Sequence, residues 1–232
     1  MAEEERLPDW MVGAGLDTDM TGDPRLDAGK NVRFWMPKGT ERKVIFLTDG
    51  DRAKVLWEHQ VRLAGKWQNW ATCLEPLRCR CGLCDWSNAK GEFGRSKVAC
   101  FTVIDCAEFK GKDGKVRSNL KKLLCAKKDT AEIVKRKWQS RREDGQSLRG
   151  AMFKVFRTNS EKSPAVGDDF EFVKMVDLAT LPDAAELPYA DLLAPNPEVV
   201  KRIVARLEAE RGLGAAPAET SAGATSDTSV EY

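Results

Sequence analysis

Four of the seven cysteines lie between positions 73 and 84, a short interval after His59, the only histidine of the 232 residues. Cys81-Gly82-Leu83-Cys84 has the spacing that lets two thiolates hold one tetrahedral Zn²⁺ from a tight turn. Gly82 allows that turn to close. Because one metal ion would draw segments more than 20 residues apart to a single point, this cluster constrains the fold more than any other feature.

We predict that His59, Cys73, Cys81 and Cys84 hold one structural Zn²⁺. His59 stands at the end of one expected strand and Cys73 at the end of the next, so a hairpin would bring both to the turn. Four protein ligands leave no position open for catalysis. Cys79 is a rival for the place of Cys73, and reduced surface thiols or a redox pair are the alternatives without metal.

The remaining cysteines, Cys100, Cys106 and Cys125, stand in apolar segments and are expected to be small core residues. The opening MAEEERLPDW is acidic, so we expect neither a secretory signal nor a transit peptide. We therefore expect reduced thiols in a soluble, intracellular protein. No apolar run approaches the roughly 20 residues that would span a bilayer, and no membrane partner is expected.

Alternating or β-branched apolar residues predict a series of short strands, separated by turns rich in Gly, Pro and Asp. These strands are expected at 32–36, 42–47, 54–60, 66–72, 97–106, 116–125, 151–157 and 169–176. Residues 73–86 are expected to form a cysteine-rich loop. Helical spacing predicts a helix over 131–139, capped by Asp129 or Thr130, and an amphipathic helix from Glu198 to Gly212.

This order predicts a mainly β protein with some α: an OB-fold, a small Greek-key barrel, with an inserted zinc-binding subdomain and a C-terminal helix. A β-sandwich would give a similar strand count. The expected regions are an acidic N-terminal arm (1–30), the OB domain (31–178) with its zinc subdomain at about 57–90, a connector and amphipathic helix (179–212), and a disordered, weakly acidic tail (213–232).

Charge is distributed unevenly along the chain. Residues 31–160 carry 29 basic and 14 acidic groups, a net charge of +15, whereas residues 1–30 carry −5 and residues 161–232 carry −8. A strongly basic middle between acidic ends is typical of proteins that bind polyanions, although many soluble domains also have solvated basic faces.

Aromatic residues are interleaved with basic ones in this middle part. Binders of single strands need a cationic groove for phosphates and exposed rings on which bases stack. Phe46, Phe101 and Phe153 are expected in the core, and Trp57, Trp67 and Trp70 are the better stacking candidates. The predicted DNA-binding residues are Trp57, Trp67, Trp70, Phe34, Trp35, Lys38, Arg42, Lys43, Lys54, Arg62, Lys66, Lys121, Lys122 and Arg157.

Motifs of common enzyme classes are absent from the sequence. It has no phosphate-binding Gly-x-x-x-x-Gly-Lys-Ser/Thr loop, no Gly-x-Ser-x-Gly elbow and no His-Glu-x-x-His. Since the single histidine is assigned to zinc, no Ser/His or Cys/His pair remains. We expect a binding protein, not an enzyme, without a small-molecule substrate.

The sequence resembles the zinc-containing, OB-fold single-stranded DNA-binding proteins of tailed bacteriophages, over about residues 31–176. The resemblance rests on Phe34-Trp35-Met36-Pro37-Lys38-Gly39, Val44-Ile45-Phe46-Leu47-Thr48-Asp49, Trp57-Glu58-His59, Cys73 with Cys81-Gly82-Leu83-Cys84, Thr102-Val103-Ile104-Asp105 and Phe153-Lys154-Val155-Phe156-Arg157-Thr158.

The resemblance implies a protein that coats single strands during phage DNA replication, recombination and repair in the cytoplasm of the infected bacterial host. It also implies an acidic C-terminal tail that recruits replication or recombination proteins. Two features depart from the family: residues 1–30 are acidic where relatives carry a basic arm, and the tail after Gly212 holds only three acidic side chains.

Two other functions remain open. A zinc-stabilised RNA-binding or transcription-regulating module would share the basic middle and the cysteine cluster. A structural or assembly protein would use zinc only to staple a loop, and its basic face would meet another protein.

Overall fold

The computed structural model describes residues 32–63, 66–110 and 116–212. The expectations for 1–30 and 213–232 lie outside these residues. The strands are β1 (Thr40–Phe46), β2 (Lys54–Leu63), β3 (Lys66–Thr72), β4 (Arg95–Asp105), β5 (Phe109–Lys110), β6 (Val116–Arg117), β7 (Leu120–Lys127), β8 (Ala151–Arg157) and β9 (Asp169–Met175). The α-helices are α3 (Gly82–Lys90), α4 (Lys128–Glu143), α5 (Tyr189–Leu192) and α6 (Pro197–Glu210), with 3₁₀ turns at Gly50–Arg52, Glu75–Leu77 and Leu178–Thr180.

Strand β4 organises the main sheet. Its residues 95–100 pair with β2 and its residues 103–105 pair with β1, while β7 pairs with residues 98–105 along the other edge. The sheet is antiparallel, with the order β3-β2-β4-β1-β8-β9 and β7 beside β4. Because β4 is flanked on both edges and covered on both faces, residues 100–105 are all buried. This burial explains the β-branched, apolar run in the sequence.

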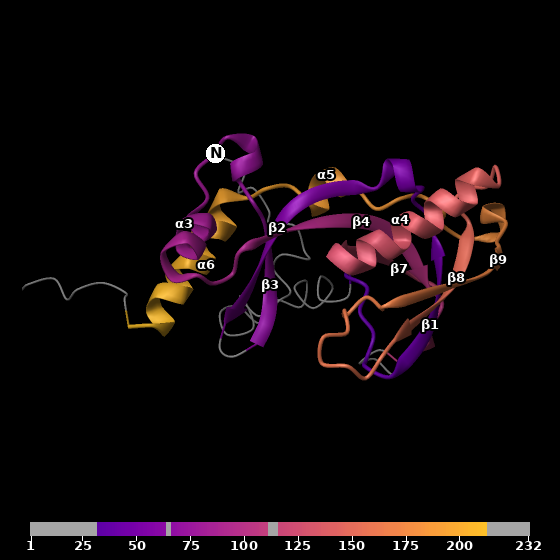
Figure 1. The fold of residues 1–232 in the computed structure, drawn as a ribbon, viewed down its shortest axis with the longest axis horizontal. Helices are drawn as coiled ribbons and strands as arrows, with labels where there is room; N and C mark the ends of the chain where they lie inside the picture. Colours follow the sequence, from indigo (N-terminus) through magenta and orange to yellow (C-terminus); the bar gives the residue numbers. More distant parts are fainter. Residues whose placement is uncertain (1–31, 64–65, 111–115, 213–232) are drawn as a thin grey trace, which may run out of the picture.

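The prediction of a mainly β protein with some helix is confirmed. The predicted closure into a barrel is not seen, because β3 and β9 stand at opposite ends of the strand order and do not pair with each other. Within the described residues the sheet is therefore open. Figure 1 shows it drawn out along the long axis, with α3 and α6 at one end and α4 with β8 and β9 at the other.

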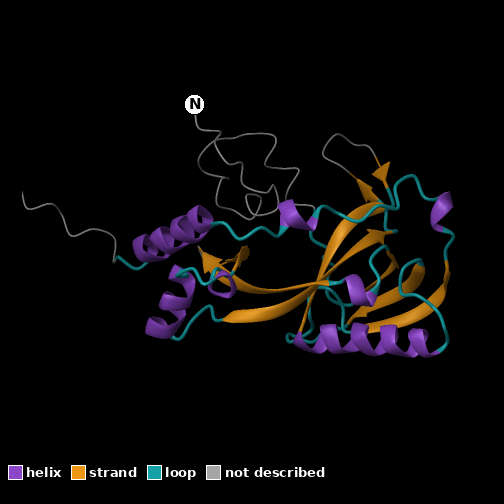
Figure 2. Cartoon of the chain, turned by 90° about the horizontal axis from the view of Figure 1, so that it is seen from above, coloured by secondary structure: helices purple, strands orange, loops and turns teal. Residues whose placement is uncertain are grey.

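The core at the α4 end is built on phenylalanine rings. Phe46 contacts Phe101 and Phe153 edge-to-face, with ring centroids 5.6 Å apart in both pairs. All three are buried, as predicted. Helix α4 covers this core with Val134, and its Trp138 lies so close to Gly50 that a Cβ there would be 2.3 Å from the indole. Figure 2 shows α4 running along this side of the sheet.

Several local predictions differ from the structure. The strand expected at 32–36 makes only a bridge between Arg33 and Leu123, because it meets the free edge of β7 for a short distance. Neither Asp129 nor Thr130 caps α4. The N-cap position is Lys127, without a side-chain hydrogen bond, and the Thr130 hydroxyl donates to the carbonyl of Gly167 instead.

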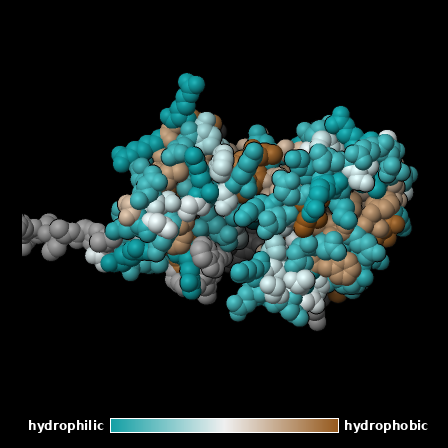
Figure 3. Space-filling model, viewed as in Figure 1, coloured by the Kyte–Doolittle hydropathy of each residue, from teal (hydrophilic) through white to brown (hydrophobic). Residues whose placement is uncertain are grey.

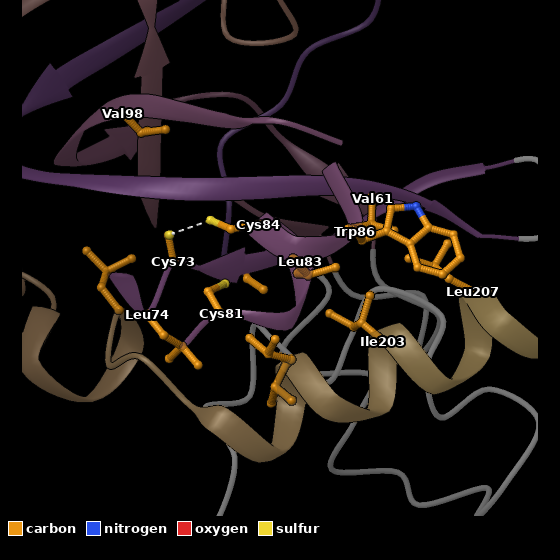
Figure 4. Packing of buried hydrophobic residues seen from close by; sticks show 14 of the residues in the cluster. Val61, Cys73, Leu74, Cys81, Leu83, Cys84, Trp86, Val98, Ile203 and Leu207 are labelled. Atoms are coloured by element: carbon orange, nitrogen blue, oxygen red, sulfur yellow. Dashed lines mark hydrogen bonds between the residues drawn. The ribbon is translucent and has the colours of Figure 1, made fainter. Parts of the chain in front are cut away.

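The C-terminal helix belongs to the cysteine end of the molecule. The apolar face of α6, with Val199, Val200, Ile203 and Leu207, is buried in one cluster with Leu83 and the cysteine ligands. In Figure 4 Ile203 lies between α6 and the short helix α3. The expected zinc subdomain at about 57–90 is therefore completed by residues more than 100 positions further along the chain.

Replacing Ile203 by Ala is expected to lower the free energy of unfolding by about 2–5 kcal/mol, because the side chain is fully buried against α3. Arg202→Ala is the control on the exposed face of α6 and is expected to change stability by less than about 0.5 kcal/mol. Urea denaturation measures both. Equal, small effects would contradict the packing of α6 on this end of the molecule.

Candidate metal centre

Three elements bring the four predicted ligands together. His59 lies on β2, Cys73 follows the last residue of β3, and the β2–β3 hairpin sets these two beside each other. Cys81 is the N-cap of α3, and Cys84 lies in its first turn. The turn is compact because the carbonyl of Cys81 accepts hydrogen bonds from the amides of Cys84 and Asp85. Figure 4 shows Cys73 and Cys84 pointing toward one another.

The distances fit a tetrahedral ion. His59 Nε2 lies 3.6 Å from Cys81 Sγ and 3.4 Å from Cys84 Sγ, and Cys73 Sγ lies 3.5 Å from Cys84 Sγ. All four ligand atoms are within 4.8 Å of one another, and all four residues are buried. A tetrahedral zinc with bonds of about 2.0–2.3 Å separates its ligand atoms by roughly 3.5–3.8 Å. These residues could therefore hold a metal ion such as zinc.

Cys79 lies outside this cluster. It is exposed, and its thiol is 3.6 Å from the carbonyl oxygen of Leu77. The left-handed backbone of Arg78, with φ of 59°, reverses the chain after the 3₁₀ turn and leaves Cys79 on the outside. Of the two candidates that the spacing leaves open, the structure brings Cys73 to the other ligands.

The surroundings of His59 orient its ring for coordination. Nδ1 donates a hydrogen bond to the backbone carbonyl of Phe93 at 2.9 Å, which leaves Nε2 facing the thiols. Phe93 offers this carbonyl from a left-handed backbone, with φ of 56°, in the loop after α3. A hydrogen bond of this kind fixes the tautomer and the orientation of a metal-binding imidazole.

Electrostatics at the cluster favour an anionic sulfur. Burial disfavours the charged imidazolium, but hydrogen bonds with Cys81 and the Phe93 carbonyl outweigh it and raise the pKa of His59 to about 9. Burial also opposes ionisation of Cys81, yet the hydrogen bond from His59 lowers its pKa to about 6. Burial and the neighbouring Cys73 raise the pKa of Cys84. A divalent cation would replace the shared protons and balance the sulfur charge.

The residues predicted to bind DNA are spread over several elements. Trp35 and Trp57 are exposed, at 55% and 37% of their surface, and Trp70 is half-buried. Lys38, Lys43, Lys54 and Arg62 are exposed, whereas Arg42, Lys121 and Arg157 are half-buried. Trp67 and Lys66 lie on β3, and their side chains are outside the described part of the structure.

Two of these residues are in the interior. Phe34 is 2% exposed. Its amide donates a hydrogen bond to the carbonyl of Leu123, and its ring lies in the phenylalanine core, so no base can stack on it there. Lys122 is 6% exposed, and burial lowers its pKa. Its ammonium lies 5.4 Å from the ring centroid of Phe109. Phe34 and Lys122 are therefore removed from the predicted DNA-binding set.

In the predicted DNA-binding set, each of the three tryptophans with a described side chain lies beside an arginine. Arg157 lies over Trp35 at 6.0 Å, Arg95 over Trp57 at 5.1 Å, and Arg33 over Trp70 at 4.6 Å from the ring centroid. Arg33 and Arg95 were not in the predicted set, and only the fold brings each of them to its tryptophan.

The arginine beside Trp70, Arg33, is bound to a buried carboxylate. Glu58 is 1% exposed. Its carboxylate accepts hydrogen bonds from both terminal nitrogens of Arg33, at 3.3 and 2.5 Å, and lies 3.0 Å from the Lys127 ammonium. These two cations hold the pKa of Glu58 below its usual value despite burial. Glu58 thus fixes the position of Arg33 over the ring of Trp70.

No protein-family model matches this chain, and no curated protein matches its sequence. None of the helices in the described ranges is both long and apolar enough to traverse a lipid bilayer.

Replacing Cys84 by Ser is expected to abolish stoichiometric metal binding and to lower the melting temperature, because a buried ligand is lost. Cys79→Ser is the matched control from the same loop, and it should leave metal content and melting temperature unchanged. Elemental analysis of the purified proteins and thermal denaturation measure both. Zinc retained at one equivalent in the Cys84 variant would contradict this ligand set.

Proposed function

We propose that this protein binds single-stranded DNA without sequence specificity and coats and protects strands exposed in phage DNA replication, recombination and repair. The observation that carries the proposal is the set of tryptophans that keep an open part of the ring beside an arginine, Trp35 and Trp57 above all. A ring of this kind can stack on any base, the guanidinium supports the ring through a cation–π contact, and the surrounding basic residues attract the phosphate backbone.

The charge of the chain supports a polyanionic partner. Residues 31–160 carry a net charge of +15, and these residues supply all of β1 to β8 and the metal ligands. Figure 3 shows that hydrophilic side chains cover most of the face it presents, with apolar residues in small patches between them. Such a surface suits a solvated nucleic acid better than a large apolar protein interface.

In this proposal the metal is one Zn²⁺ with a structural role. The donor set of three sulfurs and one imidazole nitrogen is one that zinc prefers, and all four ligands come from the protein. The proposal therefore describes a binding protein rather than an enzyme. The ion would fasten the β2–β3 hairpin to α3 and keep Trp57, two residues from a ligand, in place.

We extend the proposal to the fold: an OB-type sheet with an inserted metal subdomain. The strand pairing supports it, because β1, β4, β7, β8 and β9 pair in one antiparallel group, and the segment from β2 to α3 is inserted between β1 and β4. Trp57, on β2 opposite Lys97 of β4, then lies in the inserted segment with its ring partly exposed.

Titration with oligothymidine and with duplex DNA of equal length is the test of this function. We expect preference for the single strand, and a log–log salt slope of about −0.7 for each phosphate neutralised. Trp35→Ala should cost about 1–3 kcal/mol if the ring stacks on a base. Leu77→Ala removes an exposed apolar side chain that has no ring and should have no effect. Equal affinity for duplex, or tighter binding to RNA, would refute the proposal.

The C-terminal tail generates a separate prediction, for residues outside the described ranges. An anionic segment tethered to a cationic surface competes with DNA. Truncation after Gly212 should raise affinity for oligothymidine modestly at low salt, with the gain fading as salt increases. The gain should be small because the tail holds only three acidic side chains. In this mechanism DNA binding frees the tail for replication or recombination proteins, and weaker binding after truncation would contradict it.

A further inference from the structure

Arg95 joins the metal cluster to an exposed tryptophan. It is the first residue of β4 and lies opposite His59 in the pairing with β2. Its Nη1 donates a hydrogen bond to Cys73 Sγ at 3.8 Å and forms an ion pair with Glu75. The same guanidinium lies over the ring of Trp57, 5.1 Å from its centroid. One side chain thus contacts a ligand sulfur and an aromatic ring.

The backbone places Trp57 beside the same ligand. The amide of Cys73 donates to the carbonyl of Trp57 at 2.8 Å. Because Trp57 precedes His59 by two residues on β2, both side chains are on the same face of the strand. The indole nevertheless keeps 37% of its surface exposed, whereas His59 is fully buried. The ring is therefore the nearest exposed aromatic surface to the metal cluster along this strand.

We propose that Arg95 is a positioning residue that couples the metal-bound sulfur of Cys73 to base stacking on Trp57. This proposal rests on the proposed function and names one of its subsites. Three thiolates and one divalent ion carry a net charge of −1, so a bound metal keeps an anionic sulfur in front of Arg95. The planar guanidinium donates to that sulfur and to Glu75, and its face supports the indole.

A lysine cannot replace this geometry. Its ammonium is a compact charge without a planar face, so it cannot donate to Cys73 and Glu75 while covering the ring of Trp57. If Arg95 only contacted a DNA phosphate, a lysine could replace it, since lysine binds a phosphate nearly as well in a non-bidentate contact. The affinity of Arg95→Lys for DNA therefore distinguishes a positioning role of Arg95 from a simple phosphate contact.

The first test is affinity for oligothymidine in the full-length, zinc-loaded protein. Trp57→Ala should weaken binding about 5- to 100-fold. Both Arg95→Gln and Arg95→Lys should weaken it about 3- to 10-fold, at an unchanged salt slope. Combining Arg95→Gln with Trp57→Ala should weaken binding no more than Trp57→Ala alone. Additive losses of affinity in the double variant would overturn the proposal. So would full affinity in Arg95→Lys together with a salt slope in Arg95→Gln that is reduced by one phosphate contact.

The second test reads the metal directly, in protein loaded with Co²⁺ in place of zinc. Loss of the N–H···S bond in Arg95→Gln should move the sulfur-to-cobalt absorption band to longer wavelength. Oligothymidine should perturb the band of the unmutated protein and leave that of Arg95→Gln unchanged. Arg157→Gln is the matched control, since Arg157 covers Trp35 and donates to the Met36 carbonyl. This variant should weaken DNA binding without moving the band.

The outcomes separate this proposal from the function on which it rests. If the unmutated protein fails to bind oligothymidine, the proposed function is wrong, and the stacking role of Arg95 falls with it. If DNA binds but the band is the same in Arg95→Gln as in the unmutated protein, the function stands and the coupling through Cys73 is refuted.

Discussion

The convergence of one imidazole and three thiols is the constraint on which one end of this molecule depends. The ligands come from the β2–β3 hairpin and from the start of the short helix α3, and the three cysteines among them lie in one apolar cluster with Val61, Leu83 and Trp86. Structural zinc contributes about 10–16 kcal/mol to the folding of small zinc-finger peptides, as much as the whole stability of many domains. A bound ion would therefore add to the apolar packing that holds the β2–β3 hairpin and α3 together with the apolar face of α6.

The opposite end is held by an apolar core of phenylalanine rings under α4. Strand β4 belongs to both ends, pairing with β2 through its first half and with β1 through its last residues. Strand β4, which begins at Arg95, therefore contributes residues both to the cluster around the metal ligands and to the phenylalanine core. The proposed function involves both ends, since Trp57 lies on β2 and Trp35 lies in the segment before β1, beside Arg157 of β8.

Local patterns predicted the regular elements well where one face of a segment is apolar. The strands expected at 66–72 and 151–157 have those bounds in the structure, and the amphipathic helix is α6. Helix α3 was missed because its nine residues lie among the cysteines and carry no strong apolar period, although Leu83 and Trp86 are buried. Phe34 was misplaced because its basic neighbours suggested an exposed ring, whereas pairing with β7 turns it inward.

The sequence by itself determined the chemistry of the metal cluster: a single histidine, a Cys-x-x-Cys pair and two further thiols in reach leave few ligand sets. It also determined the basic middle of the chain. Only the tertiary structure decided between Cys73 and Cys79, since pairing with Trp57 places Cys73 beside the other ligands and the left-handed turn at Arg78 leaves Cys79 outside. Only the tertiary structure placed α6 against α3 and Arg95 between Cys73 and Trp57. Contacts of this kind join residues far apart in the chain, and local propensity and spacing carry no information about which distant partner a side chain meets.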